Sequence, residues 1–325
     1  MRASVVISTF NRSDALAQTL AGLSHQDIPA DAYEVIVVDD GSTDDTATML
    51  AAADVPFPLV VRRTDHNRGV SAGRNLGMSA ARGDVLILLS DDVIVPESFV
   101  RLHVETVRDH PGYWVVGAFS QLPELTRTPF GRYLDRLESS FEQARIDSPL
   151  GDGLYEMGML TARNLSLPRA DIERIGMFDE QFRTTCEDQD LAIRASAVGV
   201  RFLYNTRLRC VHNDAAADLR RYCAFQERGA RDTVRMWRKY PEIVAPAEIV
   251  AVNGPARLED GPTLLAKKLL KRALAGARTT ALLASGIAAG ERAGLPDAIL
   301  FRAYTTLIGI HIFRGWRAEL RAAGA

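Results

Sequence analysis

Residues 85–96 of the chain read VLILLSDDVIVP, and this stretch decides the fold. The apolar run at 85–89 is typical of a strand that is buried on both faces of a parallel sheet. Open α/β sheets bind ligands beyond the carboxyl ends of such strands, which is where Asp91 and Asp92 stand in the chain. Paired carboxylates there indicate a divalent cation that is shared with the phosphate oxygens of a ligand. The alternative is a turn or a helix cap, with Pro96 and Glu97 opening the helix.

Length and composition set the broad class of the protein. The 325 residues are 47% hydrophobic and 25% charged, which is ordinary for one large globular domain or two smaller ones. The formal net charge of -2 shows no basic excess that would indicate nucleic acid as a partner. The 3 cysteines lack the paired spacing of a zinc site and favour free thiols in a reducing compartment. A signal-peptide pattern and an apolar run of about 18 residues are both missing, so we expect a cytoplasmic protein.

Apolar strand-like runs alternate with helix-like patterns in the first part of the chain. Strands are expected at residues 5–8, 34–39, 59–62 and 85–89, with helices at 13–26, 43–53 and 70–81 between them. This alternation predicts right-handed βαβ units and an α/β fold with a mainly parallel sheet flanked by helices.

The regularity weakens after residue 97. We expect a helix and then a strand at 114–117, a helix at 131–144, a glycine-rich mobile segment at 148–153, a helix at 188–197 and a strand at 201–204. Beyond residue 212 the pattern is helical, at 219–239, 264–289 and 296–321, and a linker with four prolines is expected at 241–262. The chain is therefore predicted to have an α/β domain at 1–217 and a helical C-terminal region at 218–325.

Three further polar clusters stand where the chain leaves the predicted sheet, namely STFNR at 8–12, DDGSTD at 39–44 and NRGVSAGRNLG at 67–77. A turn and a helix cap account for much of the second cluster but leave Asp40, whose carboxylate can accept hydrogen bonds from a base or from ribose. The glycines of the third cluster do not match the G-x-G-x-x-G dinucleotide fingerprint, and the chain has no Walker sequence. The small residues of this cluster allow close packing on the sheet, while the fork of Arg74 can reach a base or a diphosphate.

In this order, VISTFNR at 6–12, DDGSTD at 39–44, NRGVSAGRNLG at 67–77 and LSDD at 89–92 resemble the family-2 glycosyltransferases. The resemblance spans roughly residues 3–212. It implies a GT-A fold that transfers a sugar from a nucleotide-diphosphate donor with inversion at the anomeric carbon. It also divides the α/β domain into a nucleotide-binding half at about 1–119 and an acceptor-side half at about 120–217.

The resemblance assigns roles to individual residues. GMFDEQF at 176–182 and CEDQDLAIR at 186–194 are similar to the family's acceptor-side signature, which makes Asp188 the general base. Glu187 and Asp190 are then acceptor-side residues that cap and orient, although all three acids also suit the first turn of a helix. The implied nucleotide contacts are Thr9 and Asp40 to the base, Asp91 to the ribose or the metal, and Asn11, Arg12 and Arg74 elsewhere in the donor site.

Metal coordination falls mainly on Asp92 by the same resemblance. The family's metal motif is often Asp-x-Asp, and its first position here is Ser90. We expect Mn²⁺ or Mg²⁺ at Asp92, stabilising the departing diphosphate while Asp188 takes the proton of the acceptor hydroxyl. His212 stands where some members have a histidine near the diphosphate, and a polar histidine at a strand end is the alternative.

The expected donor is a UDP-, dTDP- or GDP-sugar, and the expected acceptor is a glycan, a lipid-linked group or a small molecule. The setting would be the synthesis of a polysaccharide, a glycolipid or another glycoconjugate. A nucleotide-sugar-binding subunit or scaffold with impaired catalysis is the alternative, which Ser90 favours. A nucleotidyltransferase has no support, because the N-terminus lacks a Gly-rich, Lys-containing triphosphate loop.

Residues 264–274 form an apolar and basic run at helical spacing. Such a helix can lie on an anionic membrane surface, which would suit a lipid-linked acceptor and place the protein at the inner face of the membrane. The commoner arrangement packs the apolar face on the catalytic domain and leaves the cations in water. Those cations are Lys267, Lys268, Lys271 and Arg272.

Overall fold

In the computed structural model, which describes residues 2–213, 218–245, 248–257 and 259–322, the chain divides into two compact units. Unit 1 comprises Met1–Glu124, Asp135–Arg183 and Glu187–Ala215, and unit 2 comprises Leu125–Leu134, Thr184–Cys186 and Ala216–Ala325. The domain boundary predicted after residue 217 adjoins residues 214–217, which lie outside the described residues. That boundary stays a prediction.

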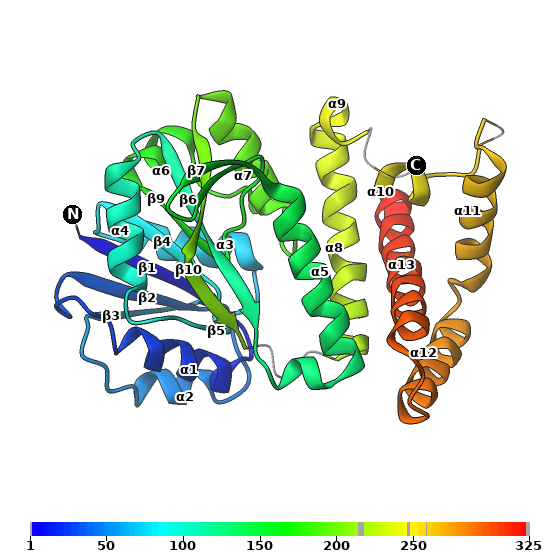
Figure 1. Ribbon diagram of the computed structural model, residues 1–325, viewed down its shortest axis with the longest axis horizontal. Helices are drawn as coiled ribbons and strands as arrows, with labels where there is room; N and C mark the ends of the chain where they lie inside the picture. Colours follow the sequence, from blue (N-terminus) through cyan, green and yellow to red (C-terminus); the bar gives the residue numbers. More distant parts are fainter. Residues whose placement is uncertain (1, 214–217, 246–247, 258, 323–325) are drawn as a thin grey trace. The chain divides into compact units, whose positions relative to one another are not determined.

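Unit 1 is built on one sheet. Its strands are β1 (Ala3–Thr9), β2 (Tyr33–Asp39), β3 (Leu59–Arg63), β4 (Val85–Leu89), β5 (Val93–Ile94), β6 (Tyr113–Gln121), β7 (Ile146–Gly151), β8 (Leu154–Met157), β9 (Asn164–Pro168) and β10 (Arg201–His212). Their order is β3-β2-β1-β4-β9-β6-β10-β8-β7, and β5 pairs with β10 (Figure 1). The first four strands of this order are parallel, as predicted. Because β9 is antiparallel to β4 and β6, the sheet as a whole is mixed.

Helices cover both faces of this sheet, because its central strands are apolar on both sides. They are α1 (Ser13–Leu23), α2 (Thr46–Ala51), α3 (Val70–Ala80), α4 (Phe99–Asp109), α6 (Arg169–Ile175) and α7 (Glu187–Ala197), whereas α5 (Pro129–Arg145) begins in unit 2 and continues into unit 1. Val5 and Ile7 of β1 belong to a core with residues of α1, α2 and α4, whereas Val6 belongs to a second core with residues of α3, α6 and α7. Side chains that alternate between two buried faces explain the unbroken apolar runs in the sequence.

Residues 148–153, predicted as a mobile segment, instead take part in a β-hairpin. Strands β7 and β8 are antiparallel, and Gly151 pairs with Leu154 across the turn. The two turn residues, Asp152 and Gly153, have φ values of 52° and 77°. A type I′ turn requires such positive φ values at both positions, and Asp-Gly is a favoured sequence for it. The glycines therefore close a hairpin rather than loosen a loop.

Strand β9 carries buried polar residues whose hydrogen bonds are completed by α4. His103 of α4 is fully buried, and its Nδ1 and Nε2 lie 2.8 and 2.9 Å from Ser166 Oγ and Asn164 Oδ1. Asn164 Nδ2 also donates to Leu208 O of β10 at 3.0 Å. Burial lowers the pKa of His103 to about 3, so the ring is neutral. Because each polar group needs its partner when it is buried, the network fixes the position of β9.

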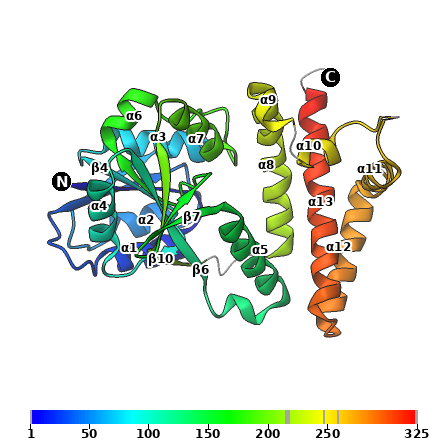
Figure 2. The same ribbon diagram turned by 45° about the horizontal axis from the view of Figure 1, so that its top comes forward.

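Unit 2 is helical. Its helices are α8 (Leu219–Lys239), α9 (Pro241–Val244), α10 (Glu248–Asn253), α11 (Pro262–Leu274), α12 (Ala277–Arg292) and α13 (Asp297–Ala322). Helices α8 and α13 run side by side in both views (Figures 1 and 2). Gly315 of α13 permits this approach, because a Cβ atom there would lie 1.8 Å from Glu227 O of α8. Nearby, Trp237 of α8 stacks on the buried Trp316 of α13.

Two predictions about the helical region are wrong. Residues 264–289, predicted as one helix, form α11 and α12, and the chain breaks at Ala275 and Gly276. Gly276 is the N-cap of α12 and has an extended backbone, with φ of -68° and ψ of 145°. The predicted linker at 241–262 contains α9 and α10, with Pro241 in the first turn of α9, where proline is tolerated. Within the described ranges, no helix is both long enough and apolar enough to cross a membrane.

Candidate active site

The carboxyl ends of β1, β2 and β4 bring together polar residues that are far apart in the chain. Asp91 and Asp92 form a turn between β4 and β5. Strand β5 then pairs with β10, and the N-cap position of the next helix, α4, is Ser98. The two aspartates therefore occupy a turn, as one alternative predicts, but they do not cap α4. Both side chains are buried at this edge of the sheet.

Asp91 and Asp92 share Arg12 as an ion-pair partner and differ in their other contacts. Thr9 Oγ1, at the end of β1, donates to Asp91 Oδ2 at 2.6 Å. Asp92 is paired with the Arg12 guanidinium, and its Oδ2 lies 3.2 Å from His212 Nε2. Burial, followed by the charge of Asp92, raises the pKa of Asp91 to about 7. Burial also acts to raise the pKa of Asp92, but His212 and Arg12 outweigh it and hold that pKa well below its usual range.

This arrangement fits a divalent cation held by few protein ligands. A carboxylate oxygen suits Mg²⁺ and Mn²⁺, and Asp92 Oδ2 lies 3.2 Å from a second donor atom, His212 Nε2. Among the residues that the structure describes, no three or more His, Cys, Asp or Glu side chains are grouped to hold a metal alone. The other ligands would be diphosphate oxygens and water, and Arg12 would have to leave Asp92.

Asp40 and Asn11 organise the loops that follow β2 and β1. Asp40 is buried, and its carboxylate accepts hydrogen bonds from Thr64 Oγ1 and Gly69 N, each at 2.8 Å. Gly69 has a φ of 101°, a conformation in which a side chain is strained. Asn11 Oδ1 accepts a hydrogen bond from Thr43 N at 2.7 Å. These contacts give both residues a structural task, and their contact with a nucleotide stays a prediction.

Arg74 of α3 contacts the acidic pair at the start of α7. Its Nη1 donates to Glu187 Oε1 at 2.8 Å and to Asp188 Oδ1 at 3.3 Å. Asp188 Oδ2 accepts a further hydrogen bond from Ala162 N at 3.0 Å. Burial and the charge of Asp188 raise the pKa of Glu187 to about 8, although Arg74 acts in the opposite direction. Arg74 thus lies with the acceptor-side acids, and its contact with a base or a diphosphate stays a prediction.

Asp190 has a partner of its own within α7. Its side chain is fully buried, and its Oδ2 accepts a hydrogen bond from Arg194 Nε at 2.9 Å. Arg194 Nη2 donates in turn to Met177 O at 2.7 Å. These contacts orient α7 against the loop that precedes it. Direct contact between Asp190 and an acceptor stays a prediction.

Two residues just before β9 belong to the site and are not among the predicted residues. Ala162 N contacts Asp188, and the carbonyl oxygen of Arg163 accepts a hydrogen bond from Ser90 N at 3.0 Å. Neighbouring residues therefore contact the turn of Asp91 and the helix of Asp188. An alanine and a single arginine before a short apolar run form no recognisable spacing. Only the insertion of β9 between β4 and β6 brings them to this place.

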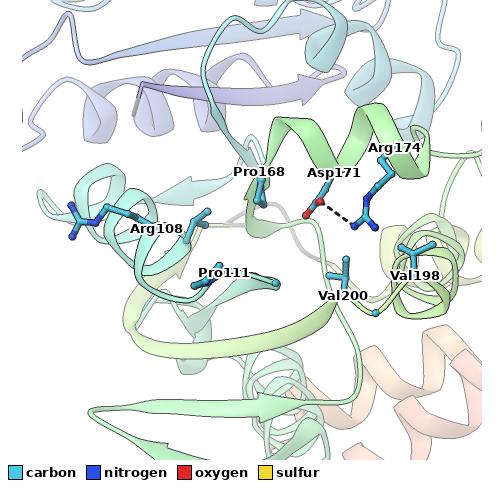
Figure 3. Close-up of a pocket in the computed structure, with 10 residues that line it drawn as sticks. Arg108, Pro111, Pro168, Asp171, Arg174, Val198 and Val200 are labelled. Carbon is cyan, nitrogen blue, oxygen red and sulfur yellow. Dashed lines mark hydrogen bonds and ion pairs between the residues drawn. The ribbon is translucent and has the colours of Figure 1, made fainter.

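A separate hollow of about 460 Å³ lies at the other end of the sheet (Figure 3). Its lining includes Gly112 and Val200, which directly precede β6 and β10. Because β6 and β10 are parallel, these residues mark the amino ends of the two strands, whereas α/β sheets bind ligands at the carboxyl ends. Arg174, beside the hollow, is already paired with Asp171 at 3.2 Å. We therefore place the candidate active site at the carboxylates and not in this hollow.

Two family models match the chain. Glycosyl transferase family 2 matches residues 4–159, and glycosyl transferase family group 2 matches residues 85–254. The uncharacterized glycosyltransferase YfnE of Bacillus subtilis is 29% identical over 78% of this chain and 74% of its own length. The succinoglycan biosynthesis protein ExoO of Rhizobium meliloti is 31% identical over 85% of this chain and 80% of its own length. The matched part of this chain spans 52% of the length of the validoxylamine A glucosyltransferase of Streptomyces hygroscopicus. It spans 16% of the length of the poly(ribitol-phosphate) beta-glucosyltransferase of Bacillus spizizenii.

Solved structures with a similar fold are also glycosyltransferases. The mannosyltransferase PcManGT of Pyrobaculum calidifontis, in complex with GDP-Man and Mn²⁺, has a TM-score of 0.59 at 21% identity, covering 97% of this chain and 87% of its own. TarS 1-349 of S. aureus, in complex with UDP-GlcNAc, has a TM-score of 0.52 at 16% identity, covering 99% and 92%. At these identities the likeness concerns the fold, and the predicted GT-A fold is confirmed.

Proposed function

The chain belongs to glycosyl transferase family 2 and is a glycosyltransferase, and we propose that it is an inverting enzyme that uses a nucleotide-diphosphate sugar. One observation carries the proposal: the short segment 162–163 contacts the carboxylate of Asp188 and the backbone of Ser90. Ala162 N donates to Asp188, while Arg163 O accepts from Ser90, the residue before the Asp91–Asp92 pair. A group that can take a proton and a group that can bind a cation are therefore connected through two neighbouring residues.

Asp188 is the proposed general base. An inverting transfer aligns the acceptor hydroxyl opposite the departing diphosphate, so the proton of that hydroxyl passes to a group on the acceptor side. The Ala162 N–H and the Arg74 guanidinium orient the carboxylate of Asp188. Burial and the charge of Asp188 raise the pKa of Glu187 to about 8, so Glu187 holds a proton more tightly beside Asp188 than it would in water.

The proposed donor site comprises Thr9, Asn11, Arg12, Asp40, Arg74 and Asp91. A divalent cation, Mn²⁺ or Mg²⁺, at Asp92 and His212 would supply positive charge to the diphosphate. The complex of PcManGT with GDP-Man and Mn²⁺ supports this class of ligands for the fold. ExoO is named for succinoglycan biosynthesis, which supports the synthesis of a glycan as the setting. The three free cysteines support a cytoplasmic location, because disulfides are rare in that compartment.

A thermal-shift screen tests the donor class. UDP, GDP and dTDP are each added with Mn²⁺ or with EDTA, and the melting temperature is measured. We expect one nucleoside diphosphate to stabilise the protein, by about 2.7 kcal/mol when its concentration is a hundred times its Kd. The stabilisation should be larger with Mn²⁺. A metal that is shared between the protein and the diphosphate adds contacts that the nucleotide alone does not make. No stabilisation by any of the three would contradict the proposed donor class.

We also propose that α11 contacts an anionic membrane surface. Residues 261–290 contain five cationic residues and no Asp or Glu, so the segment is complementary to anionic lipid. Leu269 and Leu270 are 52% and 56% exposed. Of the four cations considered from the sequence, Lys268 pairs with Asp260 at 2.7 Å and Lys271 donates to Asn253 at 3.0 Å. The lipid-facing set is therefore the two leucines with Lys267 and Arg272, which are exposed.

Flotation with liposomes tests this membrane contact. We expect the wild type to float with vesicles that contain anionic lipid, and not with neutral vesicles. The double variants Leu269→Ser with Leu270→Ser, and Lys267→Gln with Arg272→Gln, should both reduce flotation, because apolar burial and charge act together. Ile299→Ser is the matched control, since Ile299 on α13 is 52% exposed. Equal flotation of all variants, or none for the wild type, would refute the contact.

A further inference from the structure

Arg163 lies at the centre of the candidate site without a role in the mechanism so far. Its carbonyl oxygen bonds Ser90 N, and the preceding residue bonds the carboxylate of Asp188. Residue 163 is therefore attached by its own backbone to the turn of the metal-side carboxylates. Its side chain is 30% exposed, so a ligand can reach it.

The side chain of Arg163 is held in place by two groups. Its Nη2 donates to Glu138 Oε1 of α5 at 2.6 Å, and its guanidinium lies over the ring of Phe119 of β6, 4.6 Å from the centroid. The same ring meets His212 edge-on, with the centroids 6.2 Å apart. Phe119 thus positions both Arg163 and the imidazole beside Asp92. A guanidinium that is already oriented loses little conformational freedom when it binds an anion.

The neighbouring carboxylates keep the guanidinium of Arg163 charged. Burial acts to lower the pKa of its guanidinium, but the charges of Glu138, Asp92 and Asp188 raise it. The charges of the proposed metal ligand, Asp92, and of the proposed base, Asp188, therefore both act on Arg163. Its planar fork has five N–H donors, one of which bonds Glu138. Such a fork matches the paired oxygens of a phosphate group.

We propose that Arg163 binds the diphosphate of the donor and stabilises the charge on it as the sugar departs. This inference rests on the proposed function. In the transfer, the bond between the anomeric carbon and the β-phosphate oxygen breaks, and its electron pair stays on that oxygen. A bond forms between the anomeric carbon and the acceptor oxygen, whose proton passes to Asp188. Arg163 keeps its own protons throughout and contributes hydrogen bonds and positive charge.

Binding of nucleotides to Arg163→Gln tests the inference. Of UDP, GDP and dTDP, the nucleotide that binds the wild type is compared by calorimetry with its nucleoside monophosphate, in EDTA and in Mn²⁺. We expect the variant to bind the diphosphate about 10- to 100-fold more weakly in both media. Binding of the monophosphate should stay unchanged, because it lacks the β-phosphate. Arg163→Lys should fall between the two, since it keeps the charge but not the fork.

Arg201→Gln is the matched control. Arg201 also lies over a ring of β6, 4.1 Å from the centroid of Tyr113, and it pairs with Glu156 at 3.4 Å, but at the amino end of the strand. Its loss should change neither affinity. If Arg163→Gln binds the diphosphate as tightly as the wild type, the inference is overturned and the proposed function stands. If Arg163→Gln does not fold, the same result for Arg163→Lys decides. A wild type that binds no nucleoside diphosphate would overturn the proposed function together with it.

Discussion

Replacing Asp188 with Asn is expected to reduce sugar transfer by about 10²- to 10⁴-fold, the contribution of a positioned general base. The change removes the basic group and the ion pair with Arg74. An asparagine at 188 keeps a carbonyl oxygen that can accept the hydrogen bond from Ala162 N. Initial rates of transfer, measured with the nucleotide sugar that the thermal-shift screen identifies, give the comparison. Nucleotide binding should stay within a few-fold of the wild type, since the base acts on the acceptor.

The control for Asp188→Asn is Asp171→Asn. Asp171 is also paired with an arginine, Arg174, at 3.2 Å, but it lies at the far end of the sheet beside the hollow. Its replacement should leave the transfer rate unchanged. Full turnover by Asp188→Asn would show that another group takes the proton. A wild type that binds the donor but transfers no sugar to any acceptor would favour the alternative of a nucleotide-sugar-binding subunit.

Replacing Asp92 with Asn is expected to remove the Mn²⁺-dependent part of nucleotide binding. Arg12 and His212 keep Asp92 ionised, and a neutral amide is a weaker ligand for a hard cation. Loss of an outer-shell partner already costs about 10- to 100-fold in metal affinity, so loss of a direct ligand should cost more. Calorimetry of Mn²⁺ binding in the presence of the nucleoside diphosphate measures this effect. The transfer rate should fall in parallel.

Asp27→Asn is the control for Asp92→Asn. Asp27 pairs with Arg101 at 2.7 Å on the surface of unit 1, away from the carboxyl ends of the strands. Its replacement should leave metal and nucleotide binding unchanged. Mn²⁺-dependent binding that persists in Asp92→Asn would place the metal on other ligands. If nucleotide binding by the wild type does not depend on metal, the presence of Ser90 at the first position of the metal motif has removed the requirement for a metal.

The nucleotide-side half of the fold was largely predictable from local pattern. Strand β4 has the predicted bounds, and α3 differs from its prediction by one residue. Apolar periodicity succeeds here because β1, β2 and β4 are buried on both faces and the helices on one. It fails at β9, whose residues alternate between apolar and polar although all but the last are buried. Their polar side chains are satisfied by His103, a partner that no local pattern reveals.

The candidate site was predictable as a set of residues but not as a network. The order of the motifs pointed to Asp92 and Asp188, and in the structure the segment at 162–163 contacts Asp188 and Ser90, two residues before Asp92. It also shows contacts that spacing could not indicate. Arg12 pairs with Asp92 across 80 residues, and Arg74 with Glu187 across 113. Such contacts depend on how the strands are ordered in the sheet. The type of a residue does not indicate which distant residue it will contact.

The sequence by itself determined the alternating strands and helices of the first hundred residues, and that carboxylates stand at strand ends, because periodicity and turn chemistry act between near neighbours in the chain. The tertiary structure alone decided that β9 runs antiparallel between β4 and β6. That insertion places Ala162 against Asp188 and Arg163 against Ser90. The physical reason is that strand pairing and side-chain packing join residues that are distant in sequence, and their free energy depends on the whole fold rather than on any local run.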